Sequence, residues 1–249
     1  MNIVVFDTET TNINKPFCYN IGYCIVDVTT GNVLLKRDYV VEQAWYNHQL
    51  FATAYYAEKR PIYVNAMRSR ATIMDKYGYI CRTMHQDFRK YKVVGAYAYN
   101  SPFDERVFNY NCDWYKCINP FDVVPIFDIR GYAMSFIVDD TYKAFCEANS
   151  LFTEAGNYST TAEAMYKFLT GDINFVEAHT ALSDSEIEKD ILLECFKRGA
   201  VVNHDYPVMR SIERVVPKTL DLTDKQGTVH TFDYNKIMIN KDRTKIWLK

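Results

Sequence analysis

The sequence of 249 residues lacks several patterns that would define its class at once. No apolar run approaches the roughly 18 residues that a membrane-spanning helix needs. The chain enters a charged strand directly, without a signal-peptide pattern. Its seven cysteines form no C-x-x-C pair, the spacing typical of zinc and redox motifs. We therefore expect a soluble protein, with no membrane partner, in a reducing cytoplasmic setting.

The charge balance excludes a globally basic nucleic-acid binder. The chain has 29 Lys and Arg against 31 Asp and Glu, a formal net charge of -2 at pH 7. A local basic surface is still compatible with this total, because steering of phosphates depends on the local field. Internal repeats and low-complexity tracts are absent, and an apolar content of 48% indicates a globular chain. The length and the high tyrosine content are compatible with a bacterial or bacteriophage source.

Turn signals and apolar patterns divide the first 200 residues into strands and helices. Residues 2–8, 21–28 and 33–41 predict three antiparallel strands. The turn-forming residues Thr29-Thr30-Gly31-Asn32 join the second strand to the third. The other predicted elements are strands at 93–97 and 123–129, a mostly helical stretch at 43–91 with breaks at 60–61 and 77–79, and helices at 140–149, 160–169 and 183–197. This order predicts an α/β domain with a mixed five-stranded sheet flanked by helices.

The sequence pattern changes after residue 200, from predicted helices to predicted short strands. Alternating residues predict a small β-meander with strands at 228–234, 236–240 and 244–248, and turns at 224–227 and 241–243. We therefore place a main domain at 1–200, with a helical basic insert at about 43–92, and a β-rich extension at 201–249. The extension could add to the sheet edge, form a dimer contact or cover a substrate, and the sequence does not choose among these.

Two acidic side chains end the first predicted strand. Asp7 and Glu9 follow the apolar run Ile3-Val4-Val5-Phe6. Because side chains alternate between the faces of a strand, both carboxylates point to the same face. Like charges on one face repel, so a positive group must bind there. Hard oxygen ligands favour Mg²⁺ or Mn²⁺.

Two more acids and a histidine fall at predicted element ends. Ser101-Pro102 predicts a helix start that places Asp104 in the first turn. A Ser183–Glu186 capping box predicts another helix, with Asp184 in its first turn and His179 just before it. Taken singly, each acid could merely complement a helix end. Together they could hold two metal ions beside a histidine that accepts a proton near neutral pH.

The three clusters occur in a fixed order along the chain. They are Asp7-x-Glu9, Asn100-x-x-Phe103-Asp104 and His179-x-x-x-x-Asp184. This ordered set resembles the proofreading-type 3′ to 5′ exonuclease family, in its four-acid variant with histidine, over residues 2–200. The resemblance implies a ribonuclease H-like fold, two Mg²⁺ or Mn²⁺ ions, and release of nucleoside 5′-monophosphates from the 3′ end of single-stranded DNA or short RNA.

The resemblance also implies roles for single residues. Asp7, Glu9 and Asp184 would hold the nucleophile-side metal, Asp7 would bridge to a second ion that Asp104 supports, and His179 would be the general base. The implied contacts to the terminal nucleotide and around the second acid come from Thr8, Thr10, Asn100 and Phe103. The insert and the chain beyond residue 200 depart from the simplest members of that family, which leaves the choice of substrate open.

The insert carries a local excess of positive charge. Residues 59–92 contain nine Lys or Arg and two acids, about +7 in total. Arg68, Arg70 and Arg82 are therefore predicted to bind phosphates. The interleaved aromatic residues, predicted as stacking platforms for unpaired bases, are Tyr63, Tyr77, Tyr79, Phe88 and Tyr91. A solvated helical face with core aromatics is the competing interpretation.

Other functions remain open at the level of the sequence. Asp7-Thr8-Glu9-Thr10-Thr11 loosely resembles a phosphatase motif with Asp7 as nucleophile, although Glu9 replaces its second aspartate. A catalytically silent nucleic-acid-binding or polymerase accessory module is the non-enzymatic alternative. Partners could include a polymerase or replication protein and a second copy of the chain. Asp128 could also face the cleft, whereas Glu188, Asp190 and Glu194 are expected to be solvated.

Overall fold

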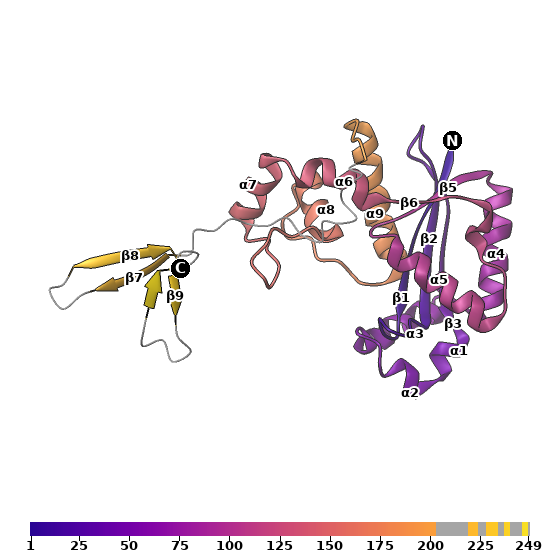
Figure 1. The fold of residues 1–249 in the computed structure, drawn as a ribbon. Helices are drawn as coiled ribbons and strands as arrows, with labels where there is room; N and C mark the ends of the chain where they lie inside the picture. The colour runs from indigo at the N-terminus through magenta and orange to yellow at the C-terminus, as the bar shows by residue number, and fades with distance from the viewer. Residues whose placement is uncertain (203–218, 224–227, 234–236, 240–245, 249) are drawn as a thin grey trace.

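The computed structural model describes residues 1–202, 219–223, 228–233, 237–239 and 246–248 (Figure 1). Six strands form a mixed sheet in the order β4-β3-β2-β1-β5-β6. The strands are β1 (Asn2–Thr10), β2 (Cys18–Asp27), β3 (Val33–Val41), β4 (Ile73–Asp75), β5 (Val93–Ala98) and β6 (Ile126–Asp128). The first three are antiparallel, as predicted, whereas β5 is parallel to β1 and β6 is parallel to β5. The predicted α/β class is confirmed.

Helices cover both faces of this sheet (Figure 1). They are α1 (Glu42–Tyr46), α2 (His48–Phe51), α3 (Arg60–Arg68), α4 (Tyr77–Lys90), α5 (Pro102–Tyr115), α6 (Ile129–Ile137), α7 (Asp140–Asn149), α8 (Ala162–Thr170) and α9 (Ala181–Lys197), with short 3₁₀ turns η1 (Ala57–Lys59) and η2 (Pro120–Val123). Helices α4 and α5 pack on Val4 and Phe6 of β1. Helices α6, α8 and α9 pack on Ile3 and Val5 of the same strand. The alternation of β1 therefore separates two hydrophobic cores.

The sheet has one strand more than the five predicted. Strand β4 is a three-residue edge strand that pairs parallel to β3 inside the stretch expected to be helical. Such a short strand gives too little alternation to be recognised in a sequence. The predicted helix breaks at 60–61 and 77–79 are instead helix starts. Pro61 lies in the first turn of α3, a position that tolerates proline, and Gly78 lies in the first turn of α4.

Two predicted helix caps are wrong. Helix α9 begins at Ala181, so residues 183–186 are already helical and form no capping box. Helix α5 begins at Pro102 as predicted, but within residues 1–202 the Ser101 hydroxyl makes no capping hydrogen bond. Helix α6 was not predicted, and Asp128 is its cap, because its carboxylate accepts from the Arg130 amide at 2.8 Å.

The described strands beyond residue 202 form two antiparallel pairs. Strand β7 (Thr219–Thr223) pairs with β8 (Val229–Asp233), and β9 (Ile237–Ile239) pairs with β10 (Ile246–Leu248). The three predicted strands are confirmed, but they belong to two separate sheets rather than to one meander. The predicted turns at 224–227 and 241–243 lie outside the described residues. Among the residues described, no helix is long and apolar enough to cross a membrane.

Candidate active site

The carboxylates of β1 face the layer of helix α9. Odd-numbered residues of this strand, such as Ile3 and Val5, pack in the core beneath α6, α8 and α9. Asp7 and Glu9 continue this side and are half-buried at the end of the strand. The even-numbered Thr8 is buried on the opposite side. The alternation expected from the sequence therefore places both acids on one face.

Strand β2 fixes the start of α9 against the sheet. The Asn20 side-chain oxygen accepts from the Ala181 amide at 2.8 Å and so satisfies a free donor at the helix start. A Cβ added at Gly22 would lie 2.0 Å from the Leu182 nitrogen, so only glycine admits the helix backbone this close. These two contacts bring Asp184, in the first turn of α9, over the end of β1.

Three carboxylates converge at this point. Asp7, Glu9 and Asp184 each offer a ligand oxygen, and these atoms lie within 4.8 Å of one another. The Oδ1 atom of Asp184 is buried and has no hydrogen-bond partner among the described residues. A buried carboxylate oxygen without a partner is costly unless a cation binds it. The three oxygen donors suit Mg²⁺ or Mn²⁺.

Asp104 approaches from the opposite layer. It lies in the first turn of α5, is 2% exposed, and accepts a hydrogen bond from the Thr8 hydroxyl at 2.6 Å. Its charge is the strongest of the neighbouring charges that raise the pKa of Asp7. Asp104 thus lies near Asp7 but outside the group of three converging oxygens.

Burial and mutual repulsion disfavour ionisation throughout the cluster. Burial, followed by the charge of Asp184, raises the pKa of Glu9 to about 9. Burial and the nearby Glu177 raise the pKa of Asp184 to about 8. Burial raises the pKa of Asp104 to about 7 against the opposing effect of its hydrogen bond from Thr8. A cation bound among such groups favours their ionised forms near neutral pH.

His179 lies at the edge of this cluster in a left-handed conformation, φ 51°. Its ring stacks on Tyr56, with centroids 4.5 Å apart and planes 11° apart. Its Nδ1 lies 3.7 Å from the Glu177 carboxylate. Burial and the charge of Lys59 lower the pKa of His179, which favours the neutral ring near neutral pH. A neutral imidazole there can accept a proton.

The insert reaches the site through Tyr56 and Lys59. The Lys59 ammonium donates to the carbonyl oxygen of Ala178 and lies 4.5 Å from the centre of the Tyr56 ring. Its positive charge also lowers the pKa of Glu9 and of Asp184. The charge pattern of the sequence places Lys59 in the basic insert but does not indicate its position beside the acids.

Two glutamates at the site were not predicted. Glu188 is 4% exposed, accepts from the Tyr99 amide at 3.0 Å and raises the pKa of Asp7, so the expectation that it is solvated was wrong. Its spacing of four residues from Asp184, which places both on one helix face, was an available signal. Glu177 forms a second group of potential ligands with His179 and Asp184, within 4.8 Å, and no motif indicated it.

Asp190 and Glu194 of α9 lie at the surface as expected, and Asp128 lies near Asp104. Asp190 is exposed, and Glu194 pairs with Arg198 at 2.7 Å on the surface. Asp128 accepts from the Asn100 amide at 2.9 Å besides capping α6. It therefore organises the turn before α5, and its charge adds to the burial that raises the pKa of Asp104.

The four residues predicted to contact the substrate near the acids differ in exposure and in the hydrogen bonds that their side chains already make. Thr8 is buried, and its hydroxyl donates to Asp104. Thr10 is partly buried and donates to the Asn12 carbonyl at 3.4 Å. Asn100 is exposed with a φ of 64°. Phe103 is half-buried beneath the Arg106 guanidinium at 5.3 Å.

The basic insert divides into core aromatics and surface cations. Tyr63, Tyr77 and Phe88 are at most 1% exposed, so their predicted role as base-stacking platforms is wrong. Tyr79 is 54% exposed and lies 5.4 Å from the Arg82 guanidinium. Arg68 and Arg70 are exposed at the end of α3. The competing interpretation, core aromatics beneath a charged face, holds for the three buried rings.

The mixed sheet, the two helical layers and the acids at the end of β1 define a ribonuclease H-like α/β protein with a candidate metal site. No protein-family model and no curated protein sequence matches the chain. Solved structures do match it.

The nuclease domain of 3′hExo, a DEDDh family member bound to rAMP, superposes with a TM-score of 0.56 at 14% identity, covering 82% of this chain and 96% of that chain. A 3′-exonuclease in 3′-end specific recognition of a histone mRNA stem-loop has a TM-score of 0.56 at 10% identity, covering 94% and 91%. A full-length 3′-exonuclease has a TM-score of 0.55 at 13% identity, covering 94% and 67%. At these identities the likeness concerns the fold, and at that level the resemblance inferred from the motifs is confirmed.

Proposed function

We propose that the chain is a metal-dependent 3′ to 5′ exonuclease that hydrolyses phosphodiester bonds at the 3′ end of single-stranded DNA or short RNA. The products are nucleoside 5′-monophosphates. The observation that carries this proposal is the convergence of the Asp7, Glu9 and Asp184 oxygens within 4.8 Å, beside His179. The fold shared with 3′-exonucleases, one of them bound to rAMP, supports it.

The residues at the end of β1 fit a pair of divalent cations. Asp7, Glu9 and Asp184 would hold one ion, and Asp7 would bridge to a second ion near Asp104. When bound, a pair of Mg²⁺ or Mn²⁺ ions activates water and stabilises the leaving oxygen of a phosphodiester. The unpartnered Oδ1 of Asp184 and the raised pKa values of the acids both favour a bound cation.

In this proposal His179 accepts the proton of the attacking water on a ring nitrogen. Its lowered pKa keeps the ring neutral before the reaction. Stacking on Tyr56 fixes the plane of the ring, and the Glu177 carboxylate stabilises the imidazolium that forms. Lys59, held by the Ala178 carbonyl, stabilises negative charge beside the acids.

Cleavage of matched single-stranded DNA and RNA oligonucleotides, labelled at the 5′ end, tests the function. We expect a ladder shortened from the 3′ end and release of mononucleotides with Mg²⁺ or Mn²⁺, and no cleavage with EDTA. Asp190→Asn, an exposed acid on α9, is the matched control for Asp7→Asn. Binding without cleavage would identify the silent module, and a phosphoryl group trapped on Asp7 would identify a phosphatase.

A further inference from the structure

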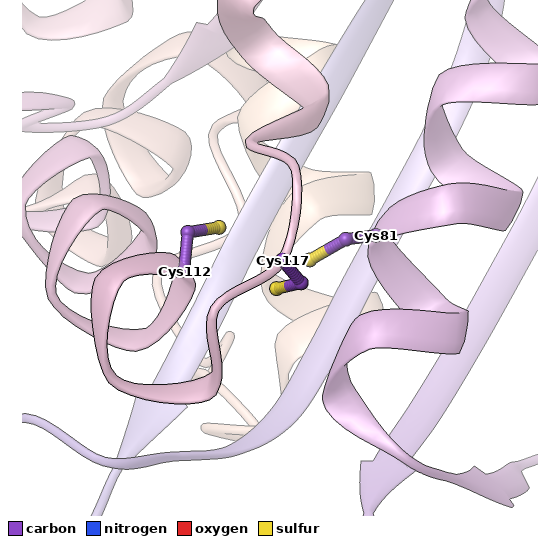
Figure 2. Close-up of side chains that lie close together, drawn as sticks. All are labelled: Cys81, Cys112 and Cys117. Carbon is purple, nitrogen blue, oxygen red and sulfur yellow. The ribbon is translucent and has the colours of Figure 1, made fainter.

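Three cysteines converge away from the acids. Cys81 comes from α4, Cys112 from α5, and Cys117 follows α5 directly. Their sulfur atoms lie within 4.8 Å of one another. Figure 2 shows the Cys81 and Cys112 side chains pointing toward each other from the two helices, with Cys117 between them. They belong to the core on the α4 and α5 side of the sheet, whereas Asp7 and Glu9 face α9.

Local backbone features bring the third cysteine into place. Helix α5 ends at Lys116 in a left-handed conformation, φ 50°, and the Cys117 amide donates to the Cys112 carbonyl at 3.1 Å. This reversal directs the chain back toward α4. A Cβ at Gly78 would lie 3.3 Å from the Cys117 Cβ, so glycine leaves room for the cysteine there.

The surroundings suit a negatively charged metal–thiolate group. A cavity of about 540 Å³ next to the cluster is lined by Cys117 and by three cations, Lys76, Arg82 and Lys116. Cys81 and Cys112 are buried and Cys117 is partly exposed. Lys116 pairs with Asp113 at 2.8 Å, so Lys76 and Arg82 would offset the net negative charge of three thiolates around a divalent ion.

We propose that Cys81, Cys112 and Cys117 bind one soft divalent cation, Zn²⁺ in preference to Mg²⁺, with its fourth coordination position open to the adjacent cavity. Thiolate ligands select zinc, and three protein ligands leave one position for water or another ligand. The ion would tie α4 of the insert to α5, whose first turn carries Asp104.

Cobalt titration tests this site separately from the acids. The protein is the full chain, reduced and stripped of metal. It carries Asp7→Asn and Asp184→Asn, which weaken binding of Co²⁺ to the carboxylates. We expect a thiolate-to-cobalt charge-transfer absorption that saturates at one Co²⁺ per chain and disappears when Zn²⁺ is added. One equivalent of Zn²⁺ should also raise the melting temperature, and binding should release thiol protons.

Matched cysteine variants decide the assignment. Cys117→Ala, at the partly exposed position, should abolish the charge-transfer band, and Cys112→Ala is the second test. Cys146→Ala, a buried cysteine of α7, should keep the band. The proposal is overturned by absence of the band in the folded parent or by its persistence in Cys117→Ala. None of these outcomes bears on nuclease activity, which is measured with Asp7 and Asp184 intact.

Discussion

The acid cluster and the cysteine cluster differ in how the chain encodes them. Asp7 and Glu9 are two residues apart on one strand, and Asp184 follows a histidine motif at a helix start. Cys81 and Cys112 come from two helices that pack on β1 and against each other, as the Tyr77 and Phe108 rings do at 6.2 Å. Ligands at element ends leave a pattern in the sequence, whereas ligands assembled by helix packing leave none.

The two clusters also differ in the charge that surrounds them. The acids are surrounded by further acids, Glu177 and Glu188, and Lys59 is the cation whose charge lowers the pKa of both Glu9 and Asp184. The cysteines adjoin a cavity with three cations. An excess of carboxylates demands hard cations, whereas thiolates beside lysines and arginine can hold a single soft ion. The following changes test this contrast, from the largest expected effect to the smallest.

Asp7→Asn should have the largest effect on nuclease activity. Asp7 lies between Asp104 and the other two acids, so its replacement disturbs both proposed ion positions. We expect kcat to fall by about 10⁴-fold or more, beyond the range of a typical single acid–base group. Asp190→Asn should stay within about twofold, since an exposed carboxylate on the surface of α9 contributes little. Activity of Asp7→Asn near that of the parent would contradict the metal assignment.

His179→Gln should reduce kcat by about 100-fold or more, the usual contribution of a general base. The lowered pKa of His179 means that the parent should lose activity only as the pH falls below about 6.5, the ordinary value. Rates measured from pH 5 to 8 should show this acid limb in the parent. The same limb in His179→Gln would assign it to another group.

Gly22→Ala should lower both stability and activity, because its Cβ would overlap the backbone of α9 at Leu182. Overpacking of this kind costs about 1–3 kcal/mol of unfolding free energy. Gly95→Ala is the control, since the atoms nearest to its Cβ belong to the side chains of Phe127 and Tyr97 and not to backbone, the nearest at 3.1 Å. Chemical denaturation should show the larger decrease for Gly22→Ala. Equal decreases in the two variants would show that the approach of α9 to β2 is not tight.

The metal-free protein should lose stability as the pH rises from about 5 to 9. Folding raises the pKa values of Glu9, Asp184 and Asp104, so the folded state holds protons that the unfolded chain has already released. Melting temperatures should therefore fall with pH, by about 2–4 °C for each kcal/mol of unfolding free energy. Mg²⁺ or Mn²⁺ should restore more at pH 8.5 than at pH 5.5. A flat profile without metal would show that neither burial nor mutual repulsion raises the pKa values of these acids.

Replacing Arg68, Arg70 and Arg82 by alanine should have the smallest effect. We expect weaker single-strand binding and a salt dependence whose slope is reduced by about 0.7 for each phosphate that these cations no longer neutralise. Cleavage at saturating substrate should stay near the parental rate, because these cations lie outside the acid group. An unchanged salt slope would remove the insert from the proposed binding surface.

Much of the fold follows from local patterns. Strand β3 and helix α7 have the predicted bounds, 33–41 and 140–149. A turn flanks the strand, and the Asp139 side chain caps the helix by accepting from the Thr141 amide. Strand β4 and helix α6 were missed. Strand β4 is too short to show a periodic pattern of apolar residues. Asp128, which caps α6, was interpreted as an acid that could face the cleft.

The convergence of the acids was predicted where carboxylates fall at element ends. The order of the acids indicated that Asp7, Glu9 and Asp184 belong together, and their oxygens do converge. The contributions of Asn20 and Gly22 were not predictable, because they depend on how closely α9 approaches β2. Lys59 likewise reaches the acids only through the path of the insert.

Release of 5′-mononucleotides from a 3′ end, measured against free Mn²⁺ concentration in the parent and in Asp184→Asn, is the most direct measurement of the proposed chemistry. We expect activity that requires the ion, with a dependence on free Mn²⁺ concentration steep enough to require more than one bound ion per chain. Activity should disappear when the unpartnered carboxylate of Asp184 is removed. Mononucleotide release that persists in EDTA, or that survives in Asp184→Asn at the parental rate, would contradict it.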